Sequence, residues 1–240
     1  EALFRQCVGA SRFAYNWALA EWQRQFEAGE KPNEAALRRQ FNALKPVDFP
    51  WILDLPKSVP QQAIKNVGRA YQRFFQKHAK FPRFKKRGVH DSARLDNGPG
   101  TFQCDGSRIR LPKIGWVRMH ETLRFDGKPW SATLSREADR WFIAIPVEIE
   151  RSEPVCESQA SVGIDLGVST AVTLSTGEKI DSPKPLKKYL QRMKRRSRQH
   201  SRKQNGSANR RKSARKLAKL HARIAHVRQN WTHQTTTDLT

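Results

Sequence analysis

One carboxylate in the second half of the chain lies among apolar neighbours, and its surroundings indicate chemistry. Asp165 stands within residues 162–171, which read Val-Gly-Ile-Asp-Leu-Gly-Val-Ser-Thr-Ala. The pattern predicts a buried β-strand, and a buried carboxylate is costly unless it faces a metal, a cation or a group of donors. Gly163 and Gly167 would leave room for another group to approach the backbone. Residues 171–174 and the turn at 175–178 complete a predicted strand hairpin.

Positive charge indicates the partner. Lysine and arginine number 46 against 22 acids, which gives a net charge of +24. Between Glu178 and Thr240 there are 19 basic and 3 acidic residues. A solvated charged face explains a few units of charge, whereas a block of this size favours a polyanion. A membrane surface and an acidic protein are alternatives, but this region has few large apolar residues to insert into lipid. We therefore expect nucleic acid and no membrane.

Length and cysteine content exclude several classes of protein. The 240 residues can hold one large domain or two to three small ones. No apolar run reaches the roughly 18 residues needed to cross a bilayer, and we expect no signal peptide. Cys7, Cys104 and Cys156 are too few and too far apart for a zinc site or a disulfide framework, which favours thiols in a reducing cytoplasm. The chain starts without Met and stops inside a helical pattern, so we expect a fragment of a longer protein.

Residues 1–79 predict helices. Apolar residues recur at spacings of three and four and form one packing face: Leu3, Cys7, Ala10, Ala14 and Trp17. Pro46, Pro50 and Pro56 predict an irregular connection. Residues 58–61 (Ser-Val-Pro-Gln) fit a capping box that opens a further helix. From this helix Lys57 and Gln61 can point towards solvent or a ligand.

Residues 81–87 (Phe-Pro-Arg-Phe-Lys-Lys-Arg) combine cations with aromatic rings. The cations can meet phosphates: Arg83, Lys85, Lys86 and Arg87. For Phe81 and Phe84 two interpretations stay open, because each ring can stack on a ligand or anchor the loop to the core.

Residues 101–150 predict five or six short antiparallel strands, which suggests a small barrel. Asp105-Gly106 between residues 102–104 and 107–111 is a strong hairpin signal. A second hairpin is predicted around residues 137–139. Residues 151–160 are polar and predict a linker.

Residues 184–238 predict two long basic helices that break at residues 205–207. Leu217, Leu220, Ile224, Val227 and Trp231 form one apolar stripe on the second helix. A solvated helix face seldom carries so many basic residues with so few acids between them. We expect these residues to contact a nucleic-acid backbone: Arg195, Arg196, Arg198, Arg202, Lys203, Arg210, Arg211, Lys212, Arg215 and Lys216.

Five segments, taken in order, resemble the OrfB/TnpB family of insertion-sequence transposon proteins, relatives of the type V CRISPR effectors. They are residues 11–16 (Ser-Arg-Phe-Ala-Tyr-Asn), 81–86, 111–117 (Leu-Pro-Lys-Ile-Gly-Trp-Val), 163–167 (Gly-Ile-Asp-Leu-Gly), and 201–207 with the helix that ends at residues 228–233. Each segment alone is weak evidence, but together they extend over nearly the whole chain.

The resemblance implies a multidomain α+β fold. Residues 1–79 would be a helical recognition domain next to a wedge-type β-barrel at residues 80–155. Residues 156–240 would be the first part of a RuvC-like nuclease domain, a ribonuclease-H-like α/β fold that begins with an Asp-bearing hairpin. The implied activity is RNA-guided cleavage of DNA. The protein would bind a guide RNA from the transposon end, recognise a short motif in double-stranded target DNA, and cut.

The resemblance also assigns roles to residues. Asp165 would be the first RuvC carboxylate, both catalytic and metal-binding, and Lys57 and Gln61 would contact the target-adjacent DNA. Such nucleases use two Mg²⁺ ions about 4 Å apart, which suit hard carboxylate oxygens. Family members carry two further carboxylates and a zinc element downstream, and none of these occurs before Thr240. The active site is therefore expected to be incomplete within these residues.

Two other functions stay open at the level of sequence. The first is a nuclease-inactive, RNA-guided DNA-binding protein. The second is an ATP-binding fold of the actin-like or sugar-kinase type, because Gly-Ile-Asp-Leu-Gly also resembles the first phosphate loop of that class. We expect a cytoplasmic protein that joins the nucleoid when bound to DNA, and the sequence does not predict its oligomeric state.

Overall fold

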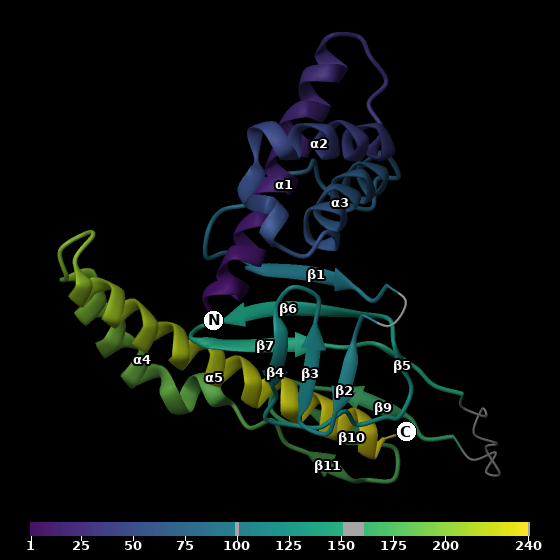
Figure 1. Ribbon diagram of the computed structural model, residues 1–240. Helices are drawn as coiled ribbons and strands as arrows, with labels where there is room; N and C mark the ends of the chain where they lie inside the picture. The colour runs from purple at the N-terminus through teal and green to yellow at the C-terminus, as the bar shows by residue number, and fades with distance from the viewer. Residues whose placement is uncertain (99–100, 151–160, 240) are drawn as a thin grey trace. The chain divides into compact units, whose positions relative to one another are not determined.

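The computed structural model describes residues 1–98, 101–150 and 161–239. The chain separates into two compact units, Glu1–Arg151 and Ser152–Thr240 (Figure 1). The expected linker at residues 151–160, with Cys156, lies outside the described residues. The domain boundaries expected at residues 79/80 and 155/156 remain predictions.

The first unit begins with the predicted helices, which the structure confirms: α1 (Ala2–Glu27), α2 (Glu34–Asp48) and α3 (Ser58–Phe75). A short 3-10 helix, η1 (Pro50–Asp54), joins α2 to α3. Asn33 caps α2, since its side chain accepts a hydrogen bond from the Ala36 amide at 2.9 Å.

Two local predictions in this region are wrong. Pro46 does not end α2 but lies inside it, and a proline so near the helix end removes only one hydrogen bond. The capping box at residues 58–61 does not form, because Lys57 has helical dihedrals and no side chain caps α3. The amide of Val59 already bonds to the carbonyl of Pro56 at 3.1 Å. The turn thus starts too early for Ser58 to take the extended backbone that an N-cap needs.

The strands of the first unit form separate antiparallel sheets. One sheet has the order β1-β6-β7, a second β2-β3-β4, and β5 pairs with β8. Their bounds are β1 (Ser92–Asp96), β2 (Gln103–Asp105), β3 (Arg108–Leu111), β4 (Gly115–Arg118), β5 (Lys128–Pro129), β6 (Ser131–Glu137), β7 (Arg140–Ala144) and β8 (Val147–Glu148). Strand pairing within the described residues does not close a barrel, so the expected barrel is corrected to open sheets. The reason is that β1 and β7 each pair only with the central β6 in this part of the chain.

Both predicted hairpins are confirmed. Asp105 pairs with Arg108, and Gly106 between them has a φ of +51°, a conformation that glycine adopts without strain. Glu137 pairs with Arg140 across the second turn. Strand β1 was not predicted, because only Ala93 and Leu95 supply the alternating apolar signal in its five residues.

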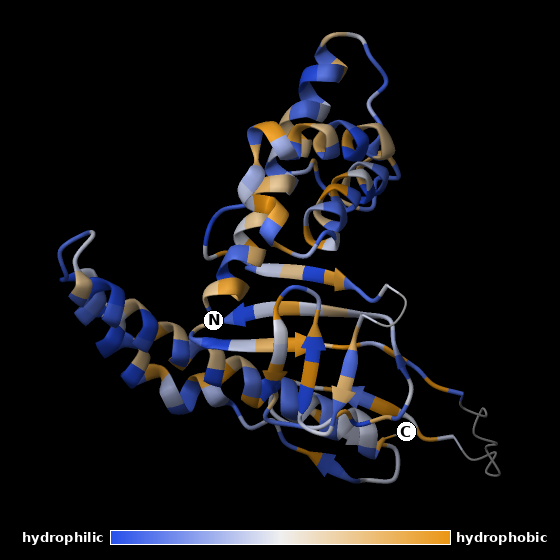
Figure 2. Ribbon diagram, viewed as in Figure 1, coloured by the Kyte–Doolittle hydropathy of each residue, from blue (hydrophilic) through white to orange (hydrophobic). Residues whose placement is uncertain are grey.

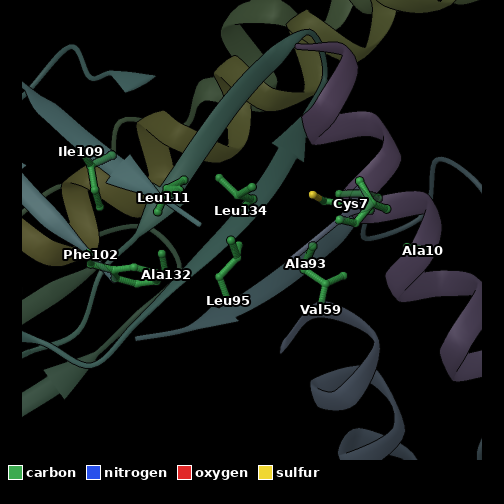
Figure 3. Close-up of a cluster of buried hydrophobic side chains, with 12 residues drawn as sticks. Cys7, Ala10, Val59, Ala93, Leu95, Phe102, Ile109, Leu111, Ala132 and Leu134 are labelled. Carbon is green, nitrogen blue, oxygen red and sulfur yellow. The ribbon is translucent and has the colours of Figure 1, made fainter. Parts of the chain in front are cut away.

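Two clusters of buried side chains form the core of the first unit. The first packs the start of α1 and the start of α3 against β1, β3 and β6, and Figure 3 shows Cys7, Val59, Leu95 and Leu134 within it. The second packs the rest of α1 against α2 and α3 around Leu19, Phe41 and Ile64. Helix α1 therefore runs through both clusters and fixes the direction of the helical part.

The second unit contains the predicted hairpin and both predicted helices. Strands β9 (Ile164–Leu166), β10 (Val172–Leu174) and β11 (Lys179–Ile180) form an antiparallel sheet of order β11-β10-β9. Helices α4 (Pro185–Ser201) and α5 (Ala208–Asp238) follow. Ser207 caps α5 by accepting a hydrogen bond from the Arg210 amide at 3.1 Å.

Helices α4 and α5 pack along the predicted apolar stripe. Leu220 and Ile224 are buried, and the Arg223 guanidinium lies 5.3 Å from the ring centre of Tyr189. Figure 2 shows that most residues of α4 are hydrophilic. In the described part of the chain, no helix combines the length and apolar character needed to cross a bilayer.

Candidate nucleic-acid interface and carboxylate site

Asp165 lies on the polar face of the β9–β11 sheet. The register pairs Asp165 with Thr173 on β10, and Thr173 with Lys179 on β11. These three residues form one row across the sheet, because paired residues point to the same face. Leu166, Val172 and Ile180 form the neighbouring row on the opposite face. The hairpin thus presents a carboxylate, a hydroxyl and an ammonium group on one surface.

The prediction that this strand is buried is wrong for the described residues. All three residues of β9 are exposed, with Ile164 at 52% and Leu166 at 76%. The physical reason is that β9 is an edge strand here and pairs only with β10 among the described strands. Burial therefore gives no evidence that Asp165 is a functional carboxylate. Its selection as a candidate metal ligand depends on the sequence motif and on its position in the hairpin.

Gly163 and Gly167 do not keep space for a ligand. A Cβ on Gly167 would lie 2.7 Å from the carbonyl oxygen of Thr170, so the turn of the same hairpin fills that space. The Gly167 amide also donates to the carbonyl of Ala171 at 3.2 Å. At Gly163 a Cβ would meet Ser175 at an ordinary 3.5 Å. Gly167 is thus required by the turn, and Gly163 is not.

Asp165 is the candidate metal ligand among the residues that the structure describes. The Asp165 carboxylate is a hard oxygen donor of the type that Mg²⁺ prefers. Residues 1–98, 101–150 and 161–239 contain no cluster of three His, Cys, Asp or Glu side chains that could hold a metal. The described residues can therefore supply one ligand but not a complete site.

Residues 81–87 form a loop in which Lys85 is held by a side chain of α1. The Asn16 side chain donates to the Lys85 carbonyl at 3.0 Å and accepts from the Lys85 amide at 2.8 Å. The Lys85 ammonium lies 4.5 Å from the ring centre of Tyr15, and burial lowers the pKa of Lys85. Two segments that carry the family resemblance, residues 11–16 and 81–86, therefore contact each other.

The two phenylalanines of this loop differ. Phe81 makes edge contacts with Tyr71 and Phe74, at centroid distances of 5.7 Å and 5.3 Å. Phe84 is 50% exposed and takes part in no ring-to-ring contact with the aromatic residues that the structure describes. Phe81 is itself 48% exposed. Its ring contacts, not burial, therefore support the anchoring interpretation for Phe81, and Phe84 is left accessible without such contacts.

Helix α4 carries a stripe of arginines. An open groove of about 710 Å³ is lined by Gln191, Arg192, Arg195, Arg198, Gln199 and Arg202. Three of the arginines were predicted, whereas Arg192 and the two glutamines were missed. Their helical spacing of three or four residues from Arg195 could have found them. Guanidinium groups bind phosphate oxygens in a bidentate manner, so the stripe suits a phosphate backbone.

The other predicted cations fall into two groups. Arg196 and Arg210 are half-buried, and Arg210 donates to the Lys203 carbonyl at 2.8 Å, which holds the connection between α4 and α5. The remaining side chains are exposed and available: Lys203, Arg211, Lys212, Arg215 and Lys216 on or beside α5, and Arg83, Lys86 and Arg87 in the loop.

Lys57 and Gln61 lie one turn apart at the start of α3, where Lys57 is exposed and Gln61 half-buried. Burial and the nearby Lys57 charge lower the pKa of Lys45, whose ammonium donates to Asn42 at 2.7 Å. The helix start adds a partial positive charge. The site is therefore cationic, and its contact with DNA remains a prediction.

Comparisons with known proteins agree on one family. A family model described as "Probable transposase" (OrfB_IS605) matches residues 144–240, and one described as "Helix-turn-helix domain" (HTH_OrfB_IS605) matches residues 1–31. In this structure Ala2–Glu27 form one continuous helix. The curated protein "Putative RNA-guided DNA endonuclease InsQ" of Escherichia coli K12 is 38% identical over 239 residues, 99% of this chain. The chain belongs to the OrfB/TnpB family.

A second relative, named "Putative RNA-guided DNA endonuclease", comes from Streptomyces pristinaespiralis and is 33% identical over 187 residues, 76% of this chain. The chain spans 59% and 46% of the lengths of these two relatives. A CRISPR-Cas12f ternary complex is similar in structure, with a TM-score of 0.41 and 14% identity over 86% of this chain and 54% of that one.

Proposed function

We propose that this family member acts in RNA-guided cleavage of DNA. The observation that carries the proposal is the 38% identity, over 99% of the chain, to a relative named as an RNA-guided DNA endonuclease. Two features of the structure support it. Asp165 lies in a strand hairpin, as the resemblance expects of the first RuvC carboxylate, and the following helices carry exposed arginines.

We assign the binding of the guide RNA and its duplex with target DNA to the cationic surfaces. The arginines of α4, the exposed cations of α5 and the loop at residues 81–87 would neutralise phosphates. Base pairing would supply the sequence specificity, since proteins of this kind recognise an RNA–DNA duplex by its backbone and shape. Lys57 and Gln61 would contact the target-adjacent DNA, and the protein would act in the cytoplasm.

We propose that Asp165 supplies one carboxylate ligand to a Mg²⁺ site whose other ligands lie outside the described residues. Bound Mg²⁺ would activate water and stabilise the leaving oxygen in phosphodiester hydrolysis. The β9–β10 pairing holds the Asp165 backbone, and Thr173 beside it can accept or donate one hydrogen bond.

Guided cleavage by the full-length protein tests this function. The protein is expressed with the RNA transcribed from its own flanking DNA, purified, and its bound RNA is sequenced. Plasmids carrying a matched target behind a randomised adjacent motif then serve as substrate. We expect a bound structured RNA and cutting only of matched targets.

Several outcomes would contradict the proposal or limit it. Absence of bound RNA, or cutting that ignores the guide, would overturn the function. Guided binding without cutting would instead indicate the nuclease-inactive alternative. The actin-like or sugar-kinase alternative rested on residues 163–167 alone, and membership of the OrfB/TnpB family removes the reason for it.

A further inference from the structure

The loop at residues 81–88 is anchored at three points. Phe81 packs on Tyr71 and Phe74, and Pro82 is buried. Lys85 is held by two backbone hydrogen bonds with the Asn16 side chain, one donated by Asn16 and one accepted by it. The loop therefore has little freedom at its start and in its middle.

The third anchor closes the end of the loop. The Gly88 amide donates to the Asp91 carboxylate at 3.1 Å, and the same carboxylate pairs with Arg12 at 3.3 Å. The Val89 amide also bonds to the Lys86 carbonyl at 3.3 Å. Asp91 is thus engaged with the backbone and with Arg12, rather than with the cations of the loop.

The residues between these anchors project outward. Arg83, Phe84, Lys86 and Arg87 are all exposed. Exposed pairs of residues lie between the anchors, so the backbone is fixed while the Phe84 ring and three cations remain accessible. A ring on a fixed backbone loses little conformational entropy when it binds, which favours a contact of defined geometry.

The chemistry of this surface selects one ligand. An exposed aromatic ring offers a π-face on which a nucleobase stacks, and neighbouring cations neutralise the phosphates on either side of that base. A base within a duplex has both faces covered by its neighbours, so Phe84 can stack on an unpaired base but not on a base inside a duplex. An acidic protein would use the cations but would not need the ring.

We propose that Phe84 is a stacking platform for an unpaired nucleobase, with Arg83, Lys86 and Arg87 contacting the flanking phosphates and Asn16 as a positioning residue. The proposal rests on the proposed function only in taking nucleic acid as the partner. The ligand is a single-stranded segment of RNA or DNA, such as a loop or an unpaired flank.

Substitution of Phe84 in the full-length protein tests the stacking. The probes are a 12-nucleotide single strand with a central 2-aminopurine, made as RNA and as DNA, and a fully paired duplex of the same length. Phe84→Ala should weaken single-strand binding by about 5- to 150-fold, the range for one lost stack. Phe84→Trp should keep the affinity, and Phe84→Leu, which keeps apolar area without a ring, should resemble Phe84→Ala. Duplex affinity should change less than twofold.

Two further readouts separate stacking from charge and from folding. The 2-aminopurine fluorescence change on binding should disappear in Phe84→Ala and persist in Phe84→Trp. Phe84→Ala should leave the salt dependence of single-strand binding unchanged. Arg83→Ala should reduce the slope of log K against log salt by about 1. Asn16→Ala should lose the fluorescence change at a temperature where the variant is folded, and Asn16→Asp, which keeps the acceptor for the Lys85 amide, should lose only part of it.

Equal single-strand affinity for wild type, Phe84→Ala and Phe84→Trp would overturn the proposal, as would equal weakening of single strand and duplex. The RNA and DNA probes distinguish the source of the base. Failure here is separable from failure of the proposed function, because guided cleavage is measured on the wild-type protein and does not depend on the Phe84 variants.

Discussion

At the scale of single residues, strand pairing determines the position of Asp165. It stands in a row with Thr173 and Lys179 on the polar face of the β9–β11 sheet. If it is a metal ligand, its oxygens have no substitute on this face, because Thr173 is neutral and Lys179 is cationic. We expect Asp165→Ala in the full-length protein to lower the rate of guided cleavage by more than about 100-fold, since even outer-shell changes at metal sites cost 10- to 100-fold. RNA binding should be retained.

The matched control is Asp181→Ala, an exposed acid in the loop after β11 of the same unit. It removes the same charge and should leave cleavage within about twofold, as expected for a surface substitution. Undiminished cleavage by Asp165→Ala would remove this residue from the mechanism.

Gly163 and Gly167 form a second matched pair at this scale. An alanine at 167 would place its Cβ 2.7 Å from the carbonyl of Thr170, so the hairpin turn must shift. Forcing an atom into filled space costs about 1–3 kcal/mol. We expect Gly167→Ala to speed amide hydrogen exchange in β9 and β10, whereas Gly163→Ala, whose Cβ meets only an ordinary contact, should not. Equal exchange in the two variants would contradict the assignment of Gly167 to the turn.

The sequence located Asp165 correctly in a strand hairpin but predicted the wrong environment for it. Apolar residues such as Ile164 and Leu166 predict that the strand is buried. Whether it is buried depends on which other elements pack against it, and the local sequence does not contain that information. In the described residues β9 has a neighbour on one side only. Likewise, the glycine pattern indicated a close approach at residue 167 but not that the approaching atom belongs to the same turn.

At the scale of elements, helix α4 concentrates arginines along one stripe. Arg195 and Arg198 both line the groove and both are exposed. Each phosphate contact contributes about one unit to the slope of log K against log salt. We expect the double variant Arg195→Ala/Arg198→Ala to weaken RNA binding by the full-length protein and to reduce that slope by about 2.

The control for charge is Lys31→Ala/Arg39→Ala, which removes two exposed cations beside and on helix α2 in the first unit. For this control, the slope of log K against log salt should change by less than about 0.5 if RNA binding depends on the α4 stripe rather than on net charge. Equal slopes for the two double variants would count against a specific role for α4.

Helices α1 and α2 are joined by Glu21. Its carboxylate accepts hydrogen bonds from Arg24 at 2.6 Å and from Gln25 and Gln40 at 3.0 Å. These donors, led by Arg24, lower the pKa of Glu21 from its ordinary 4.5 to about 2. A lowered carboxyl pKa stabilises the folded state above pH 4.5, and the effect is lost as the pH falls through about 2.

We therefore expect Glu21→Gln to lower the free energy of unfolding by about 1 kcal/mol at pH 7, a value kept small by solvent screening. The melting temperature should fall by about 2–4 °C. The difference from wild type should shrink between pH 4.5 and pH 2. Glu27→Gln on α1, an exposed acid, is the control and should show no such pH dependence. A difference that stays constant with pH would contradict the role given to the ionised carboxylate.

Sequence patterns predicted the long helices and the hairpin strands but missed the short strand β1. The apolar stripe of α5 and the spacing in α1 extend over many turns, so each supplies a strong signal. Strand β1 has only two alternating apolar residues, yet it pairs with β6, and these two residues are buried in the first core cluster together with Val59 of α3. Whether short strands close into a barrel depends on pairing between distant segments, which local pattern does not encode.

At the scale of the whole molecule, two features are relevant to function: the net positive charge and the share of its relatives' length that the chain spans. The segment from Glu178 onward has 19 basic and 3 acidic residues, a net charge of +16 in a chain whose total is +24. The chain also spans only 59% of the first relative, and the described residues hold no cluster of three metal-ligating side chains. On the proposed function, binding of nucleic acid and cutting of DNA are therefore separable, because charge supplies the first and metal the second.

Removal of metal tests this separation. A chelator added to the full-length protein with its bound RNA should reduce guided cleavage by more than about 100-fold, since water activation and leaving-group stabilisation both depend on the ion. Bound RNA should stay bound, because cationic side chains hold the phosphates. Adding Mg²⁺ alone should restore cutting. Adding Ca²⁺ alone should not, because its longer and more variable oxygen coordination does not reproduce octahedral Mg²⁺ geometry. Cleavage that survives chelation would exclude a metal role for Asp165, and release of the RNA by the chelator would show that metal, not charge, holds it.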